Sequence, residues 1–264
     1  MKAKWLNGIM GLIIFAPILL MGVWAVTARW PWPDLWPESF SLRGLQEIWR
    51  QGGRLGHSIF TSILVSLVTA FLATAFSLAS ARALLDASGF LTRLIRMTLS
   101  LPFLIPVTVL ATGIHQKMIQ WGLSNSVTGI ILVHLIYSLP YSAYLIHDAY
   151  QAIGVRLEEQ AWLLGANRWQ AFMKVSLPQL IPVLFTSFSM AYIVSFSQYF
   201  LTLMIGGGQV QTLSILIFPY LQANDRTIAS NYSLLFLVIT LVVLAVFQLA
   251  IKIYQRHYQT VKYY

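Results

Sequence analysis

Long uncharged stretches alternate with short polar segments along most of this chain. Stretches without a formal charge cover residues 5–28, 55–81, 97–116, 118–147, 175–224 and 227–251. An α-helix needs about 20 mostly apolar residues to cross a bilayer. The pattern therefore predicts six membrane-spanning helices, at 6–28, 57–81, 97–118, 127–148, 180–205 and 231–251.

The fifth uncharged stretch is long enough for two helices, but it is interrupted. The run Gly206-Gly207-Gly208 breaks the pattern, and the apolar segment 212–221 that follows is too short to span and contains Pro219. Non-helical backbone at membrane depth is tolerated only against protein or a wet cavity. We expect this segment to be an apolar loop that re-enters the membrane or lies at its surface.

The first stretch follows Lys2 and Lys4 and thus resembles a secretory signal. Its apolar core exceeds the 7–15 residues typical of such signals, so we expect a retained helix.

The segment 29–56 carries Trp30-Pro31-Trp32-Pro33, which suits an aromatic belt at a membrane surface. Leu42, Leu45, Ile48 and Trp49 fall at helical spacing and predict a short surface helix.

The basic residues predict the orientation. With the N-terminus inside, eleven of the 17 Lys and Arg residues fall on the cytoplasmic side and six on the other. Cytoplasmic loops of membrane proteins carry an excess of Lys and Arg. We therefore predict that both termini are cytoplasmic.

Composition agrees with a membrane protein. Apolar residues make up 58% of the chain and charged residues only 9%, whereas an ordinary soluble domain is roughly 25% charged. This disfavours a soluble enzyme, a disordered protein and a nucleic-acid-binding domain. The net charge of +9 mostly records the orientation, and the absence of cysteine excludes disulfides and thiolate metal sites.

The most informative polar segment is the predicted cytoplasmic loop at 150–178. It begins with a helical pattern from Glu158, Gly165 permits a turn with positive φ, and Asn167 is a candidate N-cap for a second helix. Pro178 is expected to end that second helix and open the fifth span. Trp169, Phe172 and Met173 give the loop an apolar face, which packs either on this chain's own helices or on a separate partner.

This loop resembles a known motif. Glu159, Gln160, Ala161, Gly165, Val175, Leu177 and Pro178 stand in the register of the Glu-Ala-Ala loop of type I ATP-binding-cassette importer permeases. Gln160 departs from the second Ala of that motif, and Val175 replaces an Ile. Weaker similarities at 101–107, 139–141 and 195–213 extend the resemblance to residues 57–250.

The resemblance implies an all-α permease of the bacterial plasma membrane, with a first helix and periplasmic loop at 1–56, a core at 57–254 and a tail at 255–264. It implies that Glu159, Ala161 and Gly165 form an elbow that docks on an ATPase, while Leu177 and Pro178 set the return into the membrane. The implied partners are that ATPase, a second permease subunit, identical or related, and a periplasmic or lipoprotein solute-binding protein.

The chain carries no Gly-x-x-x-x-Gly-Lys-Ser/Thr phosphate loop, so ATP hydrolysis is expected of a partner. We expect no cofactor, no metal site, no catalytic residue and no nucleic-acid partner. An ion-coupled secondary transporter remains the main alternative, yet such proteins place ionisable groups at mid-membrane. Here Asp86 and Asp148 lie near predicted inner ends, and His134 is the mid-span candidate, either for proton relay or for helix packing.

An intramembrane enzyme and a structural membrane subunit are alternatives from other classes, although the chain has no His-Glu-x-x-His and no Gly-x-Ser-x-Gly motif. Ser195, Ser197, Gln198 and Tyr199 place polar groups on the fifth predicted span. They either line the solute pathway or form hydrogen bonds between helices. The motif variant is most similar to permeases for polyamine, thiamine, ferric iron or sulfate.

Overall fold

The structure is a computed structural model that describes residues 2–31, 33–85, 89–154 and 156–261. Side chains are described between residues 10 and 255, apart from those gaps and residues 85 and 91. Trp32 and Asp86 lie outside the described residues, as do the side chains of Lys2 and Lys4. The same holds for most of the tail predicted at 255–264.

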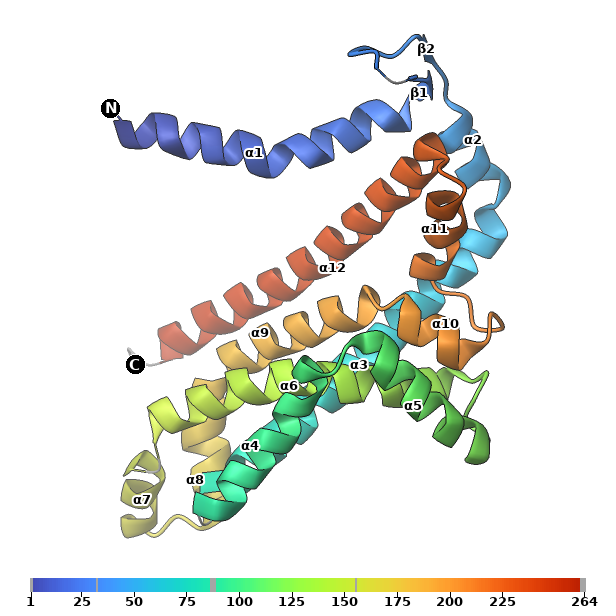
Figure 1. The fold of residues 1–264 in the computed structure, drawn as a ribbon. Helices are drawn as coiled ribbons and strands as arrows, with labels where there is room; N and C mark the ends of the chain where they lie inside the picture. The colour runs from blue at the N-terminus through green and yellow to red at the C-terminus, as the bar shows by residue number, and fades with distance from the viewer. Residues whose placement is uncertain (1, 32, 86–88, 155, 262–264) are drawn as a thin grey trace. The chain divides into compact units, whose positions relative to one another are not determined.

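Helices account for most of the described chain (Figure 1). Four of them are long and apolar enough to cross a membrane, and a bent pair raises the number to five. The segments that match the predicted spans are α1 (Lys2–Ala25), α3 (Gly52–Leu85), α4 (Gly89–Leu104) with α5 (Val107–Gln120), α6 (Val127–Ile153), α9 (Leu177–Phe196) and α12 (Arg226–Val261). The predicted all-α membrane architecture is confirmed, and the helices are consistent with six spans.

The chain divides into two compact units, the first of which comprises residues 1–60 and 211–242. It contains the antiparallel pair β1 (Thr27–Arg29) and β2 (Ser39–Phe40), then α2 (Arg43–Arg50) and α11 (Leu213–Gln222). The amide of Asn231 donates to the carbonyl of Ala25 over 2.7 Å, and the rings of Tyr220 and Tyr232 stack. The predicted surface helix at 42–49 is confirmed as α2.

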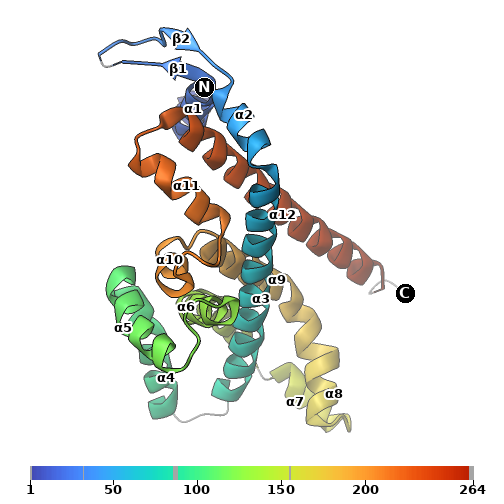
Figure 2. The ribbon, with the colours of Figure 1, turned by 90° about the vertical axis from the view of Figure 1, so that its right-hand side faces the viewer.

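The second unit comprises residues 61–210 and 243–264, with α6 at its centre. Helix α6 packs along α9 and also contacts α4, α5 and α10 (Phe200–Gly206). Figure 2 shows α5, α6 and α10 side by side. Their contact is a core of buried apolar side chains that includes Ala111, Met118, Ile130, Val133, Leu201 and Ile205.

The span predicted at 97–118 is two helices instead of one. Helices α4 and α5 meet at an angle of 107° across Ile105 and Pro106. Pro106 has φ −53° and ψ 136°, an extended conformation, and stands at the N-cap position of α5. Because a proline disfavours helical backbone at the residue before it and has no N–H to donate, the chain turns here.

The region predicted as one span at 180–205 is also interrupted. Helix α9 ends at Phe196, and α10 begins at Phe200 after a break of three residues. The break at the glycine run is confirmed, since Gly207 caps α10 in the left-handed conformation. The loop predicted at 212–221 is wrong, because Leu213–Gln222 forms α11, whose Leu213, Leu216 and Ile217 are buried.

Gly129 offers a test of the packing at the start of α6. A Cβ added there would lie 2.0 Å from the carbonyl oxygen of Leu123, which is backbone and cannot rotate away. We expect Gly129→Ala to lower the free energy of unfolding by about 1–3 kcal/mol, as overpacked sites do. The thermal unfolding temperature of the detergent-solubilised chain measures the effect.

Gly113→Ala in α5 is the matched control, because no atom lies within 4 Å of a Cβ at that position. Alanine favours a helix over glycine by up to about 1 kcal/mol, so this variant should unfold at the same temperature or higher. Equal losses in both variants would contradict the packing.

Candidate functional site

The predicted cytoplasmic loop forms an elbow of two helices. Helix α7 (Arg156–Leu163) ends at a turn in which the N–H of Gly165 donates to Trp162 over 2.9 Å and that of Ala166 to Ala161 over 3.0 Å. Gly165 has φ +87°, which a residue with a side chain rarely adopts. This pair of bonds caps the carbonyl end of α7. The predicted helix and break are confirmed.

Asn167 begins the second half of the elbow as predicted. Its side chain accepts from the N–H of Gln170, and the Gln170 side chain accepts from the N–H of Asn167, a reciprocal capping box. Helix α8 (Arg168–Ala171) follows directly.

The prediction that Pro178 ends this helix is wrong. A π-helical turn (Phe172–Ser176) joins α8 to α9, so that a continuous helix runs from Arg168 to Phe196. The N–H of Leu177 donates to the carbonyl of Phe172, five residues back. The wider π turn accommodates the ring of Pro178, which would meet the carbonyl four residues earlier in a regular helix. The elbow is therefore joined without a break to a membrane helix.

Glu158 holds the elbow to the rest of its unit. Its side chain is fully buried, and its Oε2 lies 3.0 Å from a guanidinium nitrogen of Arg82 on α3. Its Oε1 accepts from the hydroxyl of Tyr150 on α6 over 2.9 Å and from the hydroxyl of Ser176 in the π turn. A buried carboxylate is tolerated only when paired and hydrogen-bonded in this way. One side chain thus links α7 to α3, α6 and the start of the α9 helix.

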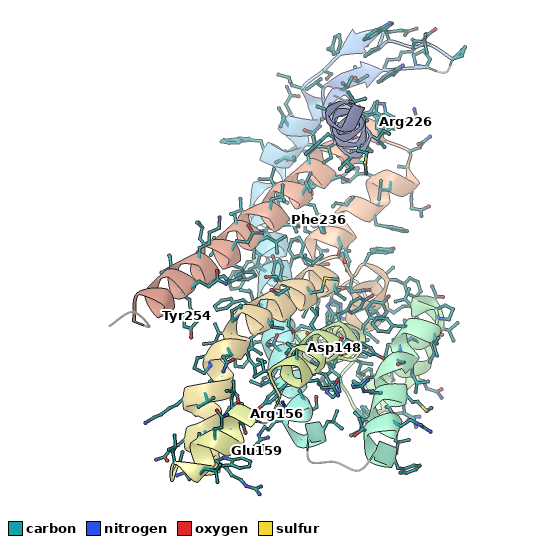
Figure 3. The ribbon with its side chains drawn as sticks, turned by 90° about the vertical axis from the view of Figure 1, so that its left-hand side faces the viewer. Asp148, Arg156, Glu159, Arg226, Phe236 and Tyr254 are labelled. Carbon is teal, nitrogen blue, oxygen red and sulfur yellow. The ribbon has the colours of Figure 1, made fainter. Side chains whose placement is uncertain are left out.

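The sequence reasoning missed Glu158 and selected its neighbour. Glu159 is exposed on the outer face of α7 (Figure 3). The signal available in the sequence was the pair of adjacent acidic residues. On a helix, two neighbours point in directions about 100° apart, so only one of them faces the interior.

The remaining residues predicted for the elbow lie at its tip, on α7 and at the start of α9. Gly165 is exposed at the tip, Ala161 is half-buried on α7, and Leu177 and Pro178 are half-buried at the start of α9. The tip also exposes large apolar side chains: Leu163 is 88% exposed, Leu164 is 89% and Trp169 is 69%. Exposed apolar side chains gathered at one tip typically mark a contact with another protein.

The four residues predicted for the solute pathway separate into two groups. The hydroxyl of Ser195 is buried and contacts Nδ1 of His134 over 2.9 Å, while Nε2 of His134 contacts the hydroxyl of Thr202 over 3.0 Å. His134 therefore joins α6 to α9 and α10 with both ring nitrogens. Ser197 is exposed, and Gln198 and Tyr199 are half-buried, at the break between α9 and α10.

Within the described part of the chain, no three His, Asp or Glu side chains gather closely enough to hold a metal ion. The elbow combines two short helices, a capped glycine turn and an exposed apolar tip.

The elbow lies within the part of the chain that matches a known protein family. Residues 86–260 match the family described as "Binding-protein-dependent transport system inner membrane component". The chain is 27% identical over 157 residues to the inner membrane ABC transporter permease protein YnjC of Escherichia coli, which covers 60% of this chain and 31% of that protein. It is 30% identical over 156 residues to the probable sulfate transport system permease protein of Chlorella vulgaris, covering 53% and 59%. The chain thus spans less than two thirds of either relative.

A third relative is the molybdenum transport system permease protein ModB of Azotobacter vinelandii, 27% identical over 142 residues, or 48% of this chain and 63% of that protein.

Among solved structures, a chain of a bacterial ABC transporter involved in the import of the acidic polysaccharide alginate has the same fold. The TM-score is 0.70 at 15% identity, covering 95% of this chain and 94% of that one. A complex of a bacterial alginate transporter with a pentasaccharide-bound periplasmic protein gives 0.64, also at 15% identity, covering 93% and 91%.

Glu158→Gln tests whether the buried carboxylate holds the elbow. The change keeps the shape of the side chain but leaves the charge of Arg82 without its partner. Removing one member of a buried pair costs about 3–5 kcal/mol, and less is expected here because the Arg82 side chain is 23% exposed. We expect a loss of about 2 kcal/mol in the free energy of unfolding, measured by denaturation in detergent.

Glu159→Gln is the control, because it removes the same charge one residue away from an exposed position. Its stability should change by less than about 0.5 kcal/mol. If both variants behave alike, Glu158 does not anchor the elbow.

Proposed function

The chain belongs to the family of binding-protein-dependent transport system inner membrane components, and we propose that it forms half of the solute path of an ATP-driven importer. The observation that carries this proposal is the elbow, a capped helical turn with an apolar tip that continues into a membrane helix. As a member of this family the chain is a multi-pass protein of the bacterial inner membrane.

The elbow is the proposed docking site for an ATPase subunit. Glu159 and Gly165 lie exposed on it, beside Leu163, Leu164 and Trp169. The apolar side chains supply the buried area of a contact, and Glu159 supplies a charge for a basic group of the partner. Ala161 packs on the inner side of α7, and Leu177 and Pro178 begin the membrane helix that continues from the elbow.

Movement of the docked elbow would reach the membrane through two routes. The first is the continuous helix from Arg168 to Phe196, which joins the elbow to the membrane segment through the π turn. The second is Glu158, which ties α7 to Arg82 on α3 and Tyr150 on α6. Through these two connections, a displacement of the elbow would be transmitted to the packed membrane helices.

The energy for transport is proposed to come from outside the chain. It has eight Asp and Glu residues and no Gly-x-x-x-x-Gly-Lys-Ser/Thr loop. The most central ionisable side chain, His134, has both ring nitrogens in contact with hydroxyl groups. This arrangement favours helix packing over the proton relay that a secondary transporter would use. ATP hydrolysis is therefore assigned to the partner.

The proposed assembly contains a second permease subunit, two ATPases and a solute-binding protein. The alginate transporter complex with its periplasmic protein supports the last of these by similarity of fold. Sulfate is the best supported of the four predicted solutes, because a related permease carries sulfate transport in its name. Ser197, Gln198 and Tyr199 at the break between α9 and α10 are the proposed solute contacts, whereas Ser195 is engaged by His134.

Leu164→Asp tests the docking of the ATPase. A carboxylate at the apolar tip would have to be desolvated on binding, so we expect the amount of ATPase that co-purifies with the chain to fall about tenfold or more. Because the side chain is 89% exposed in the chain, folding should not change. Quantitative pull-down of the co-expressed ATPase measures the effect.

Leu35→Asp is the matched control, since Leu35 is 84% exposed in the segment predicted to be periplasmic. It should retain the ATPase. Full retention by Leu164→Asp, or equal loss by both variants, would contradict docking at the elbow.

The source of energy is tested by uptake into proteoliposomes that hold the assembled complex, with sulfate offered first and the other three solutes in turn. We expect uptake only when ATP is present on the ATPase side, and no loss of uptake when a proton or sodium ionophore is added. Uptake that is abolished by the ionophore and does not depend on ATP would support an ion-coupled transporter instead.

A further inference from the structure

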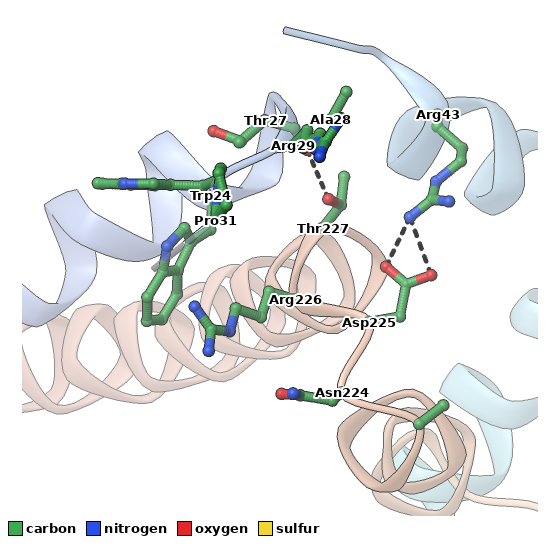
Figure 4. Close-up of a pocket in the computed structure, with 12 residues that line it drawn as sticks. Trp24, Thr27, Ala28, Arg29, Pro31, Arg43, Asn224, Asp225, Arg226 and Thr227 are labelled. Carbon is green, nitrogen blue, oxygen red and sulfur yellow. Dashed lines mark hydrogen bonds and ion pairs between the residues drawn. The ribbon is translucent and has the colours of Figure 1, made fainter. Parts of the chain in front are cut away.

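The first unit contains a pocket that the proposed importer function does not use. It has a volume of about 530 Å³ and lies where the end of α1, strand β1, the start of α2 and the loop before α12 come together (Figure 4). Its lining includes Trp24, Arg29, Trp30, Arg43, Asp225 and Arg226. Three arginines and one aspartate give these walls an excess of positive charge.

Two of the charges neutralise each other. A guanidinium nitrogen of Arg43 lies 2.8 Å and 2.9 Å from the two carboxylate oxygens of Asp225. The N–H of Ile228 also donates to this carboxylate over 3.2 Å. Asp225 therefore has its partners already, and it stands directly before Arg226, the first residue of α12.

Arg226 has no such acidic partner. Its guanidinium carbon lies 5.6 Å from the centre of the Trp24 ring, and none of the ion pairs in the described part of the chain includes it. Arg29 pairs with Glu38 over 3.2 Å, and both side chains are largely exposed, so water weakens this ion pair. A guanidinium held against an aromatic ring keeps its N–H groups free for a planar or tetrahedral oxyanion.

The surroundings of the pocket are apolar on one side. The rings of Trp24 and Trp30 meet edge to face with centroids 6.4 Å apart, with Trp24 in the last turn of α1 and Trp30 directly after β1. On α1 itself Leu19 is 64% exposed and Leu20 is 40% exposed within the chain. Tryptophan near the end of an apolar helix is typical of the level of lipid headgroups.

We propose that this pocket binds a phosphate group, with the guanidinium of Arg226 as its main donor and Arg29 as a second positive charge. The same chemistry is offered by the headgroup of an anionic phospholipid and by free phosphate. The apolar surface of α1 next to the pocket favours the phospholipid, whose acyl chains would lie along that helix while its phosphate reaches Arg226.

The test compares phospholipid binding by the full chain and two matched variants. Native mass spectrometry counts adducts when the chain is titrated with phosphatidylglycerol or with phosphatidylcholine. We expect wild type to prefer phosphatidylglycerol, and Arg226→Gln to bind it about tenfold more weakly while its binding of phosphatidylcholine stays unchanged. Arg50→Gln removes the same charge from α2, outside the pocket, and should behave as wild type.

Trp24→Leu provides a second variant that keeps every charge. Removal of the ring that holds the guanidinium should weaken binding of phosphatidylglycerol about threefold. Thermal unfolding of each variant shows that it is folded, and co-purification of the ATPase should be unaffected. A failure of the phosphate site is thereby distinguished from a failure of the importer proposal.

A further arm identifies the source of the phosphate. If inorganic phosphate at matched ionic strength raises the unfolding temperature of wild type but not of Arg226→Gln, the site also takes free phosphate, which supports the proposal. Equal weakening in Arg226→Gln and Arg50→Gln would overturn it, because the effect would then be one of surface charge. Absence of any preference for phosphatidylglycerol in wild type, with no response to phosphate, would overturn it as well. A third result would also overturn it. If Arg226→Gln abolishes binding of the solute-binding protein, and neither phosphatidylglycerol nor inorganic phosphate has a specific effect, the pocket binds a carboxylate of that protein instead.

Discussion

The buried carboxylate of Glu158 is the interaction on which the rest of the proposed mechanism depends. It lies fully inside the protein and joins the elbow to Arg82 on α3, Tyr150 on α6 and Ser176 at the start of the α9 helix. An ionised group in such a place is tolerated only while all its partners remain in reach. The elbow can therefore shift only together with the helices that hold it, which is the property a coupling element needs.

Local sequence signals predicted much of the elbow and little of its anchoring. Gly165 and Asn167 form hydrogen bonds with residues a few positions away in the chain. The turn and the N-cap could therefore be predicted from the sequence alone. The burial of Glu158 depends on Arg82, which lies 76 positions earlier in the sequence, and no local pattern contains that contact. Pro178 was misleading because its effect depends on the turn before it, which is π-helical here.

For the membrane helices, too, the sequence predicted the local features and not the contacts between distant segments. Gaps between charged residues predicted the four long apolar helices and the bent pair, since a bilayer requires long apolar segments whatever their packing. They could not reveal the 107° bend between α4 and α5 or the break between α9 and α10, because neither changes the charge pattern. Interior hydrogen bonds such as those of His134 with Ser195 and Thr202 likewise depend on which helices meet.

The most direct measurement of the central claim is photo-cross-linking from the tip of the elbow. A photoreactive amino acid at position 164 would be activated in membranes that contain the whole complex, and the products would be identified by mass. We expect a covalent adduct with the ATPase subunit, at a yield that changes when ATP is added. An adduct with lipid or with a second copy of this chain alone would contradict the assignment of the elbow as the site through which ATP hydrolysis moves this permease.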